Sequence, residues 1–209
     1  MAINTKRPPL KETVGAQYVC FQKDESKEWT ESYEEDVEKT EVVKSVKVTE
    51  NMEPTDVYAS GVIYDTDNTN TGTDIEVEAI AFPISTLAKM RAENTDEGGL
   101  CLSGGGRVRP YFAYGKVVKF KSGKVRYEWY PKCKLSENSD DASTKEEKFS
   151  EQTETIKIKA YPFNEDGDVK AYVDSSMESF PAGLTEEKFF SKPVYTKELL
   201  TEVVGEVGE

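Results

Sequence analysis

Hydrophobic and polar residues alternate with a period of two along several short segments of the chain. The segments IEVEA (75–79) and IKIKA (156–160) each place apolar side chains on one face and charged side chains on the other, which is the pattern of a half-buried β-strand. A Ser-Gly pair at 122–123 separates two such segments and favours a tight turn, because glycine readily adopts a positive φ. The pattern predicts strands at residues 16–22, 42–51, 75–82, 111–120, 124–135, 149–163 and 169–175.

One segment follows a helical period instead. Residues 83–99 begin with Pro83, which suits the first turn of a helix, and they place Ile84 and Leu87 at helical spacing before a stop signal of two glycines. The chain shows little of the strand–helix–strand alternation that produces parallel sheets. We therefore predict a mainly β fold, an antiparallel β-sandwich with one flanking α-helix, a long hairpin loop and extended terminal arms.

The predicted strands and helix fall within residues 16–180, which we interpret as one sandwich domain. Residues 1–15 and 181–209 have weaker patterns and are predicted to be an N-terminal arm and a C-terminal arm. Inside the domain, residues 52–74 form a long excursion that is polar at its tip and too long for a tight hairpin loop. Loops of this length are uncommon in compact domains unless they are functional or ordered by a partner.

Composition narrows the classes of partner. Forty acidic residues against 27 basic residues give a net charge of −13, which opposes binding to DNA phosphates or to anionic lipid. The three cysteines are widely spaced, so neither a disulfide framework nor a zinc site is indicated. No segment has the apolar length of a signal-peptide core or a membrane span, and we expect no membrane contact.

The chain contains no histidine. This removes the usual general base at neutral pH, the common nucleophile triads and the commonest metal ligand. Glu76 and Glu78 are a weak candidate for a glycosidase dyad, because residues two apart on a strand normally form a charged solvent face. The oxygen-rich segment 65–74 lacks the spacing of a calcium loop. We predict a protein that is not an enzyme, with no catalytic residues, cofactors or metal sites.

A set of residues around the predicted hairpin has a specific order and spacing. Residues 123–129 have the pattern Gly-Lys-x-Arg-Tyr-x-Trp, and Lys132, Lys134, Thr144-Lys145, Phe149 and Gln152-Thr153-x-Thr155-Ile156 follow it. In this order the segment resembles the major tail proteins, the tail tube subunits, of long-tailed non-contractile phages of Gram-positive bacteria. Weaker matches at DVYASG (56–61) and DIEVEAIAFP (74–83) extend the resemblance to roughly half of the chain.

The resemblance implies a β-sandwich subunit that forms hexameric rings, stacked into a hollow tube through which genomic DNA passes without specific binding. Its partners would be other copies of itself and the tail tip, tape measure and tail terminator proteins. It would be located in the virion tail, after assembly in the bacterial host cytoplasm. The resemblance also implies a long hairpin loop and terminal arms that join one ring to the next, and for the loop we choose 52–74. The residues that we assign to this inter-ring loop are Val57, Tyr58, Tyr64, Asp65 and Asp67.

A tube of this kind would explain why charged and apolar residues alternate. A strand that lines it must turn one face to its own core and the other to water, and a slip of one residue would exchange the faces. We hypothesise that Glu76, Glu78, Lys157 and Lys159 face the lumen and form cross-strand ion pairs if their strands are neighbours. We further expect a lumen of net negative sign, which repels the DNA backbone at short range.

A protein of another class is the alternative. A monomeric carbohydrate- or cell-wall-binding sandwich would use the aromatic residues Tyr111, Tyr127 and Trp129 as a platform for sugar. With this net charge, we interpret these aromatics as core or interface groups instead. Formation of rings or tubes by the purified protein separates the two functions.

Overall fold

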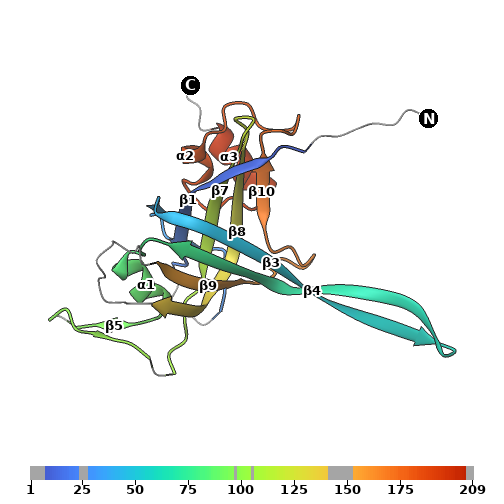
Figure 1. The fold of residues 1–209 in the computed structure, drawn as a ribbon, viewed down its shortest axis with the longest axis horizontal. Helices are drawn as coiled ribbons and strands as arrows, with labels where there is room; N and C mark the ends of the chain where they lie inside the picture. The colour runs from blue at the N-terminus through green and yellow to red at the C-terminus, as the bar shows by residue number, and fades with distance from the viewer. Residues whose placement is uncertain (1–7, 24–27, 97, 105, 141–152, 206–209) are drawn as a thin grey trace, which may run out of the picture.

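Antiparallel strands make up most of the protein, which is described here by a computed structural model covering residues 8–23, 28–96, 98–104, 106–140 and 153–205 (Figure 1). The strands are β1 (Lys11–Phe21), β2 (Glu38–Thr40), β3 (Val43–Ala59), β4 (Val62–Ala79), β5 (Asn94–Thr95), β6 (Cys101–Leu102), β7 (Phe112–Phe120), β8 (Val125–Asp140), β9 (Glu154–Ala160) and β10 (Ala171–Asp174). The helices are α1 (Ile84–Met90), α2 (Glu186–Phe189) and α3 (Lys197–Gly205). The predicted mainly β fold, an antiparallel sandwich with a flanking helix, is confirmed.

One folded sheet forms both layers, with the strand order β2-β1-β7-β8-β9-β4-β3. β8 belongs to both layers, since residues 126–129 pair with β10 and residues 133–140 pair with β9. Pro131 lies between these two parts, where the register with β7 shifts, and such an irregularity is a position where a strand tolerates proline. We call β2, β1, β7, β10 and the start of β8 the first half-sheet. The end of β8 with β9, β4 and β3 is the second half-sheet, whose strands cross the first in Figure 1.

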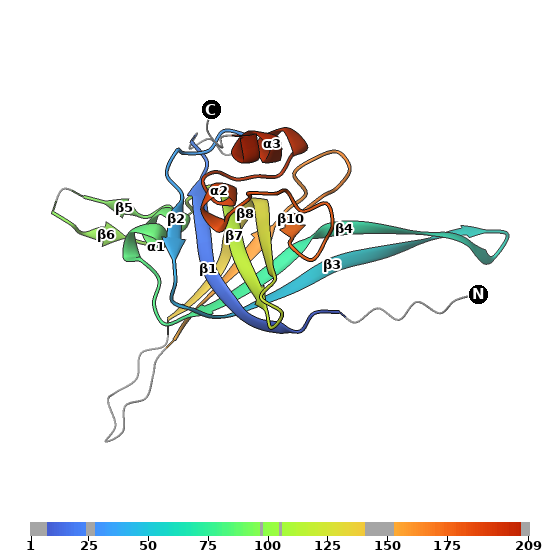
Figure 2. The ribbon, with the colours of Figure 1, turned by 90° about the horizontal axis from the view of Figure 1, so that it is seen from above.

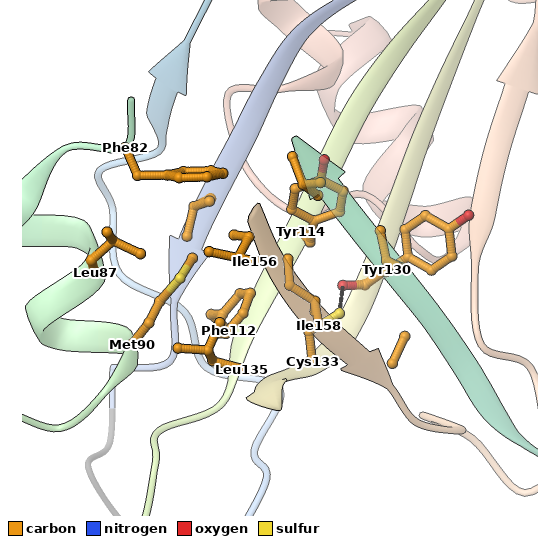
Figure 3. Packing of buried hydrophobic residues seen from close by; sticks show 14 of the residues in the cluster. Phe82, Leu87, Met90, Phe112, Tyr114, Tyr130, Cys133, Leu135, Ile156 and Ile158 are labelled. Carbon is orange, nitrogen blue, oxygen red and sulfur yellow. Dashed lines mark hydrogen bonds between the residues drawn. The ribbon is translucent and has the colours of Figure 1, made fainter. Parts of the chain in front are cut away.

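The main hydrophobic core lies between the two half-sheets (Figure 3). Ile156 and Ile158 of β9 and Phe112 of β7 are fully or almost fully buried there. Helix α1 closes one end of this core with Leu87 and Met90. Because burial of each such side chain contributes about 1.5–3 kcal/mol, this core supplies much of the driving force for packing the half-sheets together.

The other face of the first half-sheet is buried as well, in a second core. Val117 of β7 and Trp129 of β8 belong to this core. The residues that cover them come from the C-terminal segment and are Leu184, Phe189, Phe190, Val194 and Val203. In place of the extended C-terminal arm predicted for 181–209, the described part of this segment therefore packs on the sheet, because a sheet that is apolar on both faces must be covered on both.

An aromatic cluster holds the C-terminal segment against the sheet. The rings of Tyr18 and Phe190 stack with centroids 3.8 Å apart, and Trp129 donates its indole N–H to the carbonyl oxygen of Phe189 at 3.1 Å. Gly115 makes this close approach possible. A Cβ atom at this position would lie only 2.8 Å from the Phe190 ring and 3.0 Å from that of Trp129, so no larger residue fits without displacement.

At the N-terminus, β1 begins five residues before the predicted strand. Residues 11–15, which were predicted to belong to the N-terminal arm at 1–15, pair with β7 instead. Lys11, Glu12 and Thr13 are all exposed, so this part of the strand has no alternation of burial to indicate it. The remainder of the predicted arm includes residues 1–7, which lie outside the described residues.

A long hairpin of β3 and β4 projects from the sandwich (Figures 1 and 2). The two strands stay paired from their base to Ala59 and Val62, and Ser60 and Gly61 form the turn with φ values of 53° and 80°. Positive φ at both positions is what two-residue hairpin turns favour. The excursion predicted at 52–74 is thus the outer part of two continuous strands that end in a tight turn.

Helix α1 is shorter than the predicted segment 83–99. It ends at Met90, and residues 94–102 form the small hairpin of β5 and β6. The carboxylate of Asp96 accepts hydrogen bonds from the backbone N–H groups of Gly98 and Leu100 at 2.9 and 2.8 Å. The helix itself ends in a Schellman motif, because Ala92 has a positive φ of 55° and the backbone N–H groups of Glu93 and Ala92 bond to the carbonyl oxygens of Ala88 and Lys89.

Candidate assembly surfaces

The predicted lumen-facing residues lie together on the outer face of the second half-sheet. Strands β4 and β9 are neighbours, and Glu76 lies directly opposite Lys157 in their register. Residues 75, 77 and 79 are buried in the main core, so the alternation turns Glu76 and Glu78 to the other face, together with Lys157 and Lys159. The structure therefore brings all four residues to one surface.

Ion pairing on this face differs from the expected pattern. Lys157 Nζ lies 2.6 Å from Oε2 of Glu137 on β8, and the pKa of Lys157 is raised by this hydrogen bond and by the charge of Glu137, with Glu76 adding to it. Ser45 donates a hydrogen bond to Oε2 of Glu78 at 3.1 Å. Glu76 and Glu78 are thus surrounded by polar neighbours on a solvated surface, which is the ordinary environment of charged residues on an outer sheet face.

The outer face of the second half-sheet is close to neutral as a whole. The charged residues that strand register places there are Asp74, Glu76, Glu78 and Glu137 on the acidic side, and Lys47, Lys134, Lys157 and Lys159 on the basic side. A hollow of about 300 Å³ on this face is lined by Lys47, Thr49, Asp74, Ile75, Glu76, Ser136 and Lys157. The net negative sign expected of the lumen is therefore not carried by this face.

The aromatic residues of the predicted hairpin do not form an open platform. Trp129 is fully buried and Tyr127 is almost so, both in the second core. Tyr111 is partly buried, and the ammonium group of Lys134 lies 3.9 Å from the centre of its ring. The interpretation of Tyr127 and Trp129 as core groups is confirmed, since stacking on a sugar needs a ring face open to solvent.

Large apolar side chains are exposed at the tip of the β3–β4 hairpin. Tyr58 and Val62 are 66% and 63% exposed, and Ile63 and Tyr64 are 56% and 78% exposed. Exposed apolar groups that gather in this way mark interaction surfaces more often than single exposed residues do. Val62 and Ile63 were not predicted as tip residues, because the polar segment 65–74 was interpreted as the tip of the loop.

The other predicted inter-ring residues, Val57, Asp65 and Asp67, lie on the paired strands of this hairpin, below its tip. Asp65 is opposite Val57 and Asp67 is opposite Thr55 in the backbone register. The side chains of Val57 and Asp67 lie outside the described residues. A Ser-Gly pair between two apolar triplets, VYA and VIY, was the signal that would have located the turn at 60–61.

A long edge strand is the third surface feature. β3 is the last strand of the order, and within the described part of the chain no strand pairs with its outer edge. Such an edge presents a row of backbone N–H and C=O groups on which another chain can pair. Pro54 on this strand does not interrupt the pairing with β4, because an edge strand tolerates proline.

A largely buried group of charged residues on β7, β8 and β10, in which Arg126 is partly exposed, was not predicted. Lys116 Nζ lies 3.2 Å from Oε2 of Glu128, and Arg126 Nη2 lies 2.8 Å from Oδ2 of Asp174. Burial lowers the pKa of Lys116, while the charge of Glu128 opposes this shift. Tyr130 also donates its hydroxyl to Glu128 at 3.3 Å. Each of these charges has a partner, so we interpret the group as structural.

Comparison with known proteins leaves the family open. No family model matches the chain, and no curated protein matches it. Within the described ranges, no group of three or more Cys, Asp or Glu side chains is placed to hold a metal ion, and no helix is long and apolar enough to cross a membrane. These surfaces and the resemblance in sequence are therefore what indicates a function.

Proposed function

We propose that the chain is a structural virion protein that assembles with copies of itself into hexameric rings, stacked as a phage tail tube. The resemblance at residues 123–156 is the starting point for this function. The observation that carries it is the projecting β3–β4 hairpin with an apolar tip (Figure 2). The tail tip, tape measure and tail terminator proteins would be its further partners in the virion.

Exposure of the apolar side chains at the hairpin tip to water is unfavourable in free energy. Burying a side chain such as Ile63 or Val62 contributes about 1.5–3 kcal/mol relative to leaving it exposed. The strands that carry these residues extend well beyond the sandwich (Figure 1), so the tip has no surface of its own subunit to pack on. A second copy in a neighbouring ring supplies that surface in the proposed tube.

The exposed edge of β3 supports lateral association in the same way. In a closed ring of identical subunits, the edge strand of each copy lies next to its neighbour and no edge is left over. This removes the hazard of uncontrolled strand addition that a long free edge creates. The outer face of the second half-sheet then forms the wall of the channel, with its acidic residues and lysines interspersed. Such a wall gives DNA no basic track to bind, which suits passage without specific binding.

A triple substitution at the hairpin tip tests the proposal. Tyr58→Ser, Ile63→Ser and Tyr64→Ser together remove most of the apolar tip but leave both cores intact. The matched control is a chain with three other exposed apolar residues changed to serine, namely Ile84, Leu100 and Met177. Sedimentation and negative-stain electron microscopy should show tubes for the wild-type and control chains. The tip variant should keep the wild-type thermal unfolding temperature but form no tubes.

Two outcomes would contradict the proposed function. The first is a wild-type chain that stays monomeric at every concentration tested. If that monomer also binds glycans, the result supports the alternative of a carbohydrate-binding sandwich. The second is a tip variant that assembles as readily as the control, because the tip would then have no part in joining rings.

A further inference from the structure

A groove lies beyond the end of β1, between residues 31–35 and residues 191–199. Its volume is about 350 Å³, and its apolar lining includes Tyr33, Tyr195 and Leu199. The ring centroids of the two tyrosines lie 6.2 Å apart in an edge-to-face arrangement. Tyr33 is held in place because its hydroxyl donates a hydrogen bond to the carbonyl oxygen of Pro131 at 2.8 Å. The groove thus offers fixed aromatic faces.

The rim of this groove carries uncompensated negative charge. Lys89 pairs with Glu34 at 2.7 Å, and Lys192 pairs with Glu202 on α3. Glu31 and Glu35 are exposed, and neither forms an ion pair with a described residue. Burial, with the nearby charge of Glu31, raises the pKa of Tyr195 to about 12. A ligand that fits this groove therefore combines positive charge with a flat apolar surface.

One segment of the chain itself has this combination. Residues 1–11 include three basic residues and no acidic residue, and Pro8-Pro9 directly follows Lys6-Arg7. Proline pairs favour the polyproline II conformation, which docks into grooves lined by aromatic side chains. Pro8 and Pro9 are exposed in the subunit, at the other end of β1 from the groove. The basic residues of this segment thus match the acidic rim of the groove, and its proline pair matches the aromatic lining.

The same copy cannot supply the segment. The groove lies at the Phe21 end of β1, since the N–H of Glu34 bonds to the carbonyl oxygen of Phe21. The strand from Lys11 to Phe21 is about 30 Å long at roughly 3.3 Å per residue. Lys6 precedes Lys11 by five residues, which span at most about 18 Å. Lys6 and Arg7 therefore fall short of the groove of their own subunit.

We propose that the groove lined by Tyr33 and Tyr195 binds the basic Lys6–Pro9 segment of a second copy of this chain. The contact is head-to-tail, because the start of β1 in one copy meets the end of β1 in the next, and contacts of this type form rings or open stacks. Glu31 and Glu35 attract the cationic side chains, while the tyrosine rings pack on the two prolines. This inference rests on the proposed function in so far as copies of the chain must associate.

Charge exchange tests the contact in the full-length chain. The double variant Glu31→Lys with Glu35→Lys, and the double variant Lys6→Glu with Arg7→Glu, should each raise the concentration for half-maximal assembly about tenfold or more, because attraction becomes repulsion. The four-fold variant that combines them should recover most of the wild-type value. The matched control, Glu178→Lys with Glu187→Lys, makes the same change in net charge at exposed residues elsewhere and should leave assembly unchanged.

Cross-linking identifies the occupant directly. A zero-length carbodiimide reagent applied to wild-type assemblies, made from a mixture of ¹⁴N and ¹⁵N chains, should join Lys6 to Glu31 or Glu35 in peptides of mixed label. Links within one label only would overturn the proposal, as would unchanged assembly of both double variants or no recovery in the combined variant. Failure of the wild-type chain to assemble at all would instead refute the proposed function.

Discussion

Replacing Phe190 with alanine tests whether the C-terminal segment is part of the folded subunit. The Phe190 ring is only 3% exposed and lies in the second core. It stacks on Tyr18 with an interplanar angle of 3°, and its centroid lies 5.2 Å from that of Trp129. The substitution leaves a void between the C-terminal segment and the first half-sheet. If the segment were instead a free arm in the unassembled subunit, the change would have almost no effect on unfolding.

The expected loss of stability is large. Truncation of a buried phenylalanine to alanine costs about 3–5 kcal/mol, and the cost is higher where the surroundings cannot collapse into the void. Gly115 lies directly under the Phe190 ring, and glycine has no side chain that can move into the space. We therefore expect a decrease of about 4 kcal/mol or more in the free energy of unfolding, against a total of about 5–15 kcal/mol for a typical domain.

Urea unfolding, followed by tryptophan fluorescence at a concentration below assembly, measures this difference. Trp129 is buried beside Phe190, so its emission reports on this core. Leu10→Ala, at a position that is 68% exposed, is the control and should change the free energy by less than about 0.5 kcal/mol. A decrease below about 1 kcal/mol for Phe190→Ala would refute the conclusion that the C-terminal segment is docked before assembly.

Two further predictions concern buried groups. Gly115→Ala should cost about 1–3 kcal/mol, because the new Cβ would lie 2.8 Å from the Phe190 ring, and an unchanged melting temperature would contradict this packing. Burial raises the pKa of Tyr114 and Tyr130 above the usual 10.0, and that of Cys20 from 9.0 to about 12. The stability that these groups contribute is therefore present below about pH 9–10 and lost as the pH rises through their folded-state pKa values. Tyrosinate absorbance at 295 nm should show these groups titrating only with cooperative unfolding, and titration near pH 10 in a folded chain would contradict their burial.

Much of the fold was predictable because alternation is a local property. Ile75 and Glu76 fall on opposite faces of any strand that contains both, so the buried face of β4 follows from the sequence alone. The residues that cover the other face of a strand cannot be identified from alternation in the same way. Trp129 alternates with charged neighbours in the sequence, yet it is buried by residues about 60 positions later in the chain. A contact over that separation leaves no trace in the periodicity of either segment.

The candidate surfaces were predictable to a different degree. Glu76 and Lys157 could be assigned to one face from alternation, and the structure adds that their strands are neighbours. The hairpin tip was predicted in the polar segment 65–74, because its composition was given more weight than the turn signal at Ser60-Gly61. Lys116 occupies a position that alternation marks as inward, and only its three-dimensional partner Glu128 makes a buried lysine tolerable.

The distribution of charge connects the two proposals. The chain carries a net charge of −13, yet the outer face of the second half-sheet is close to neutral. The excess of acidic over basic residues therefore lies on other parts of the chain. Residues 28–41 contain seven acidic residues against Lys39 alone, and this segment forms one side of the tyrosine-lined groove. In an assembly of identical copies such a band is repeated on every subunit. Like charges brought within a Debye length of about 8 Å repel one another. A basic segment from the next copy, placed on this band, would bring Lys6 and Arg7 to it and so reduce that repulsion.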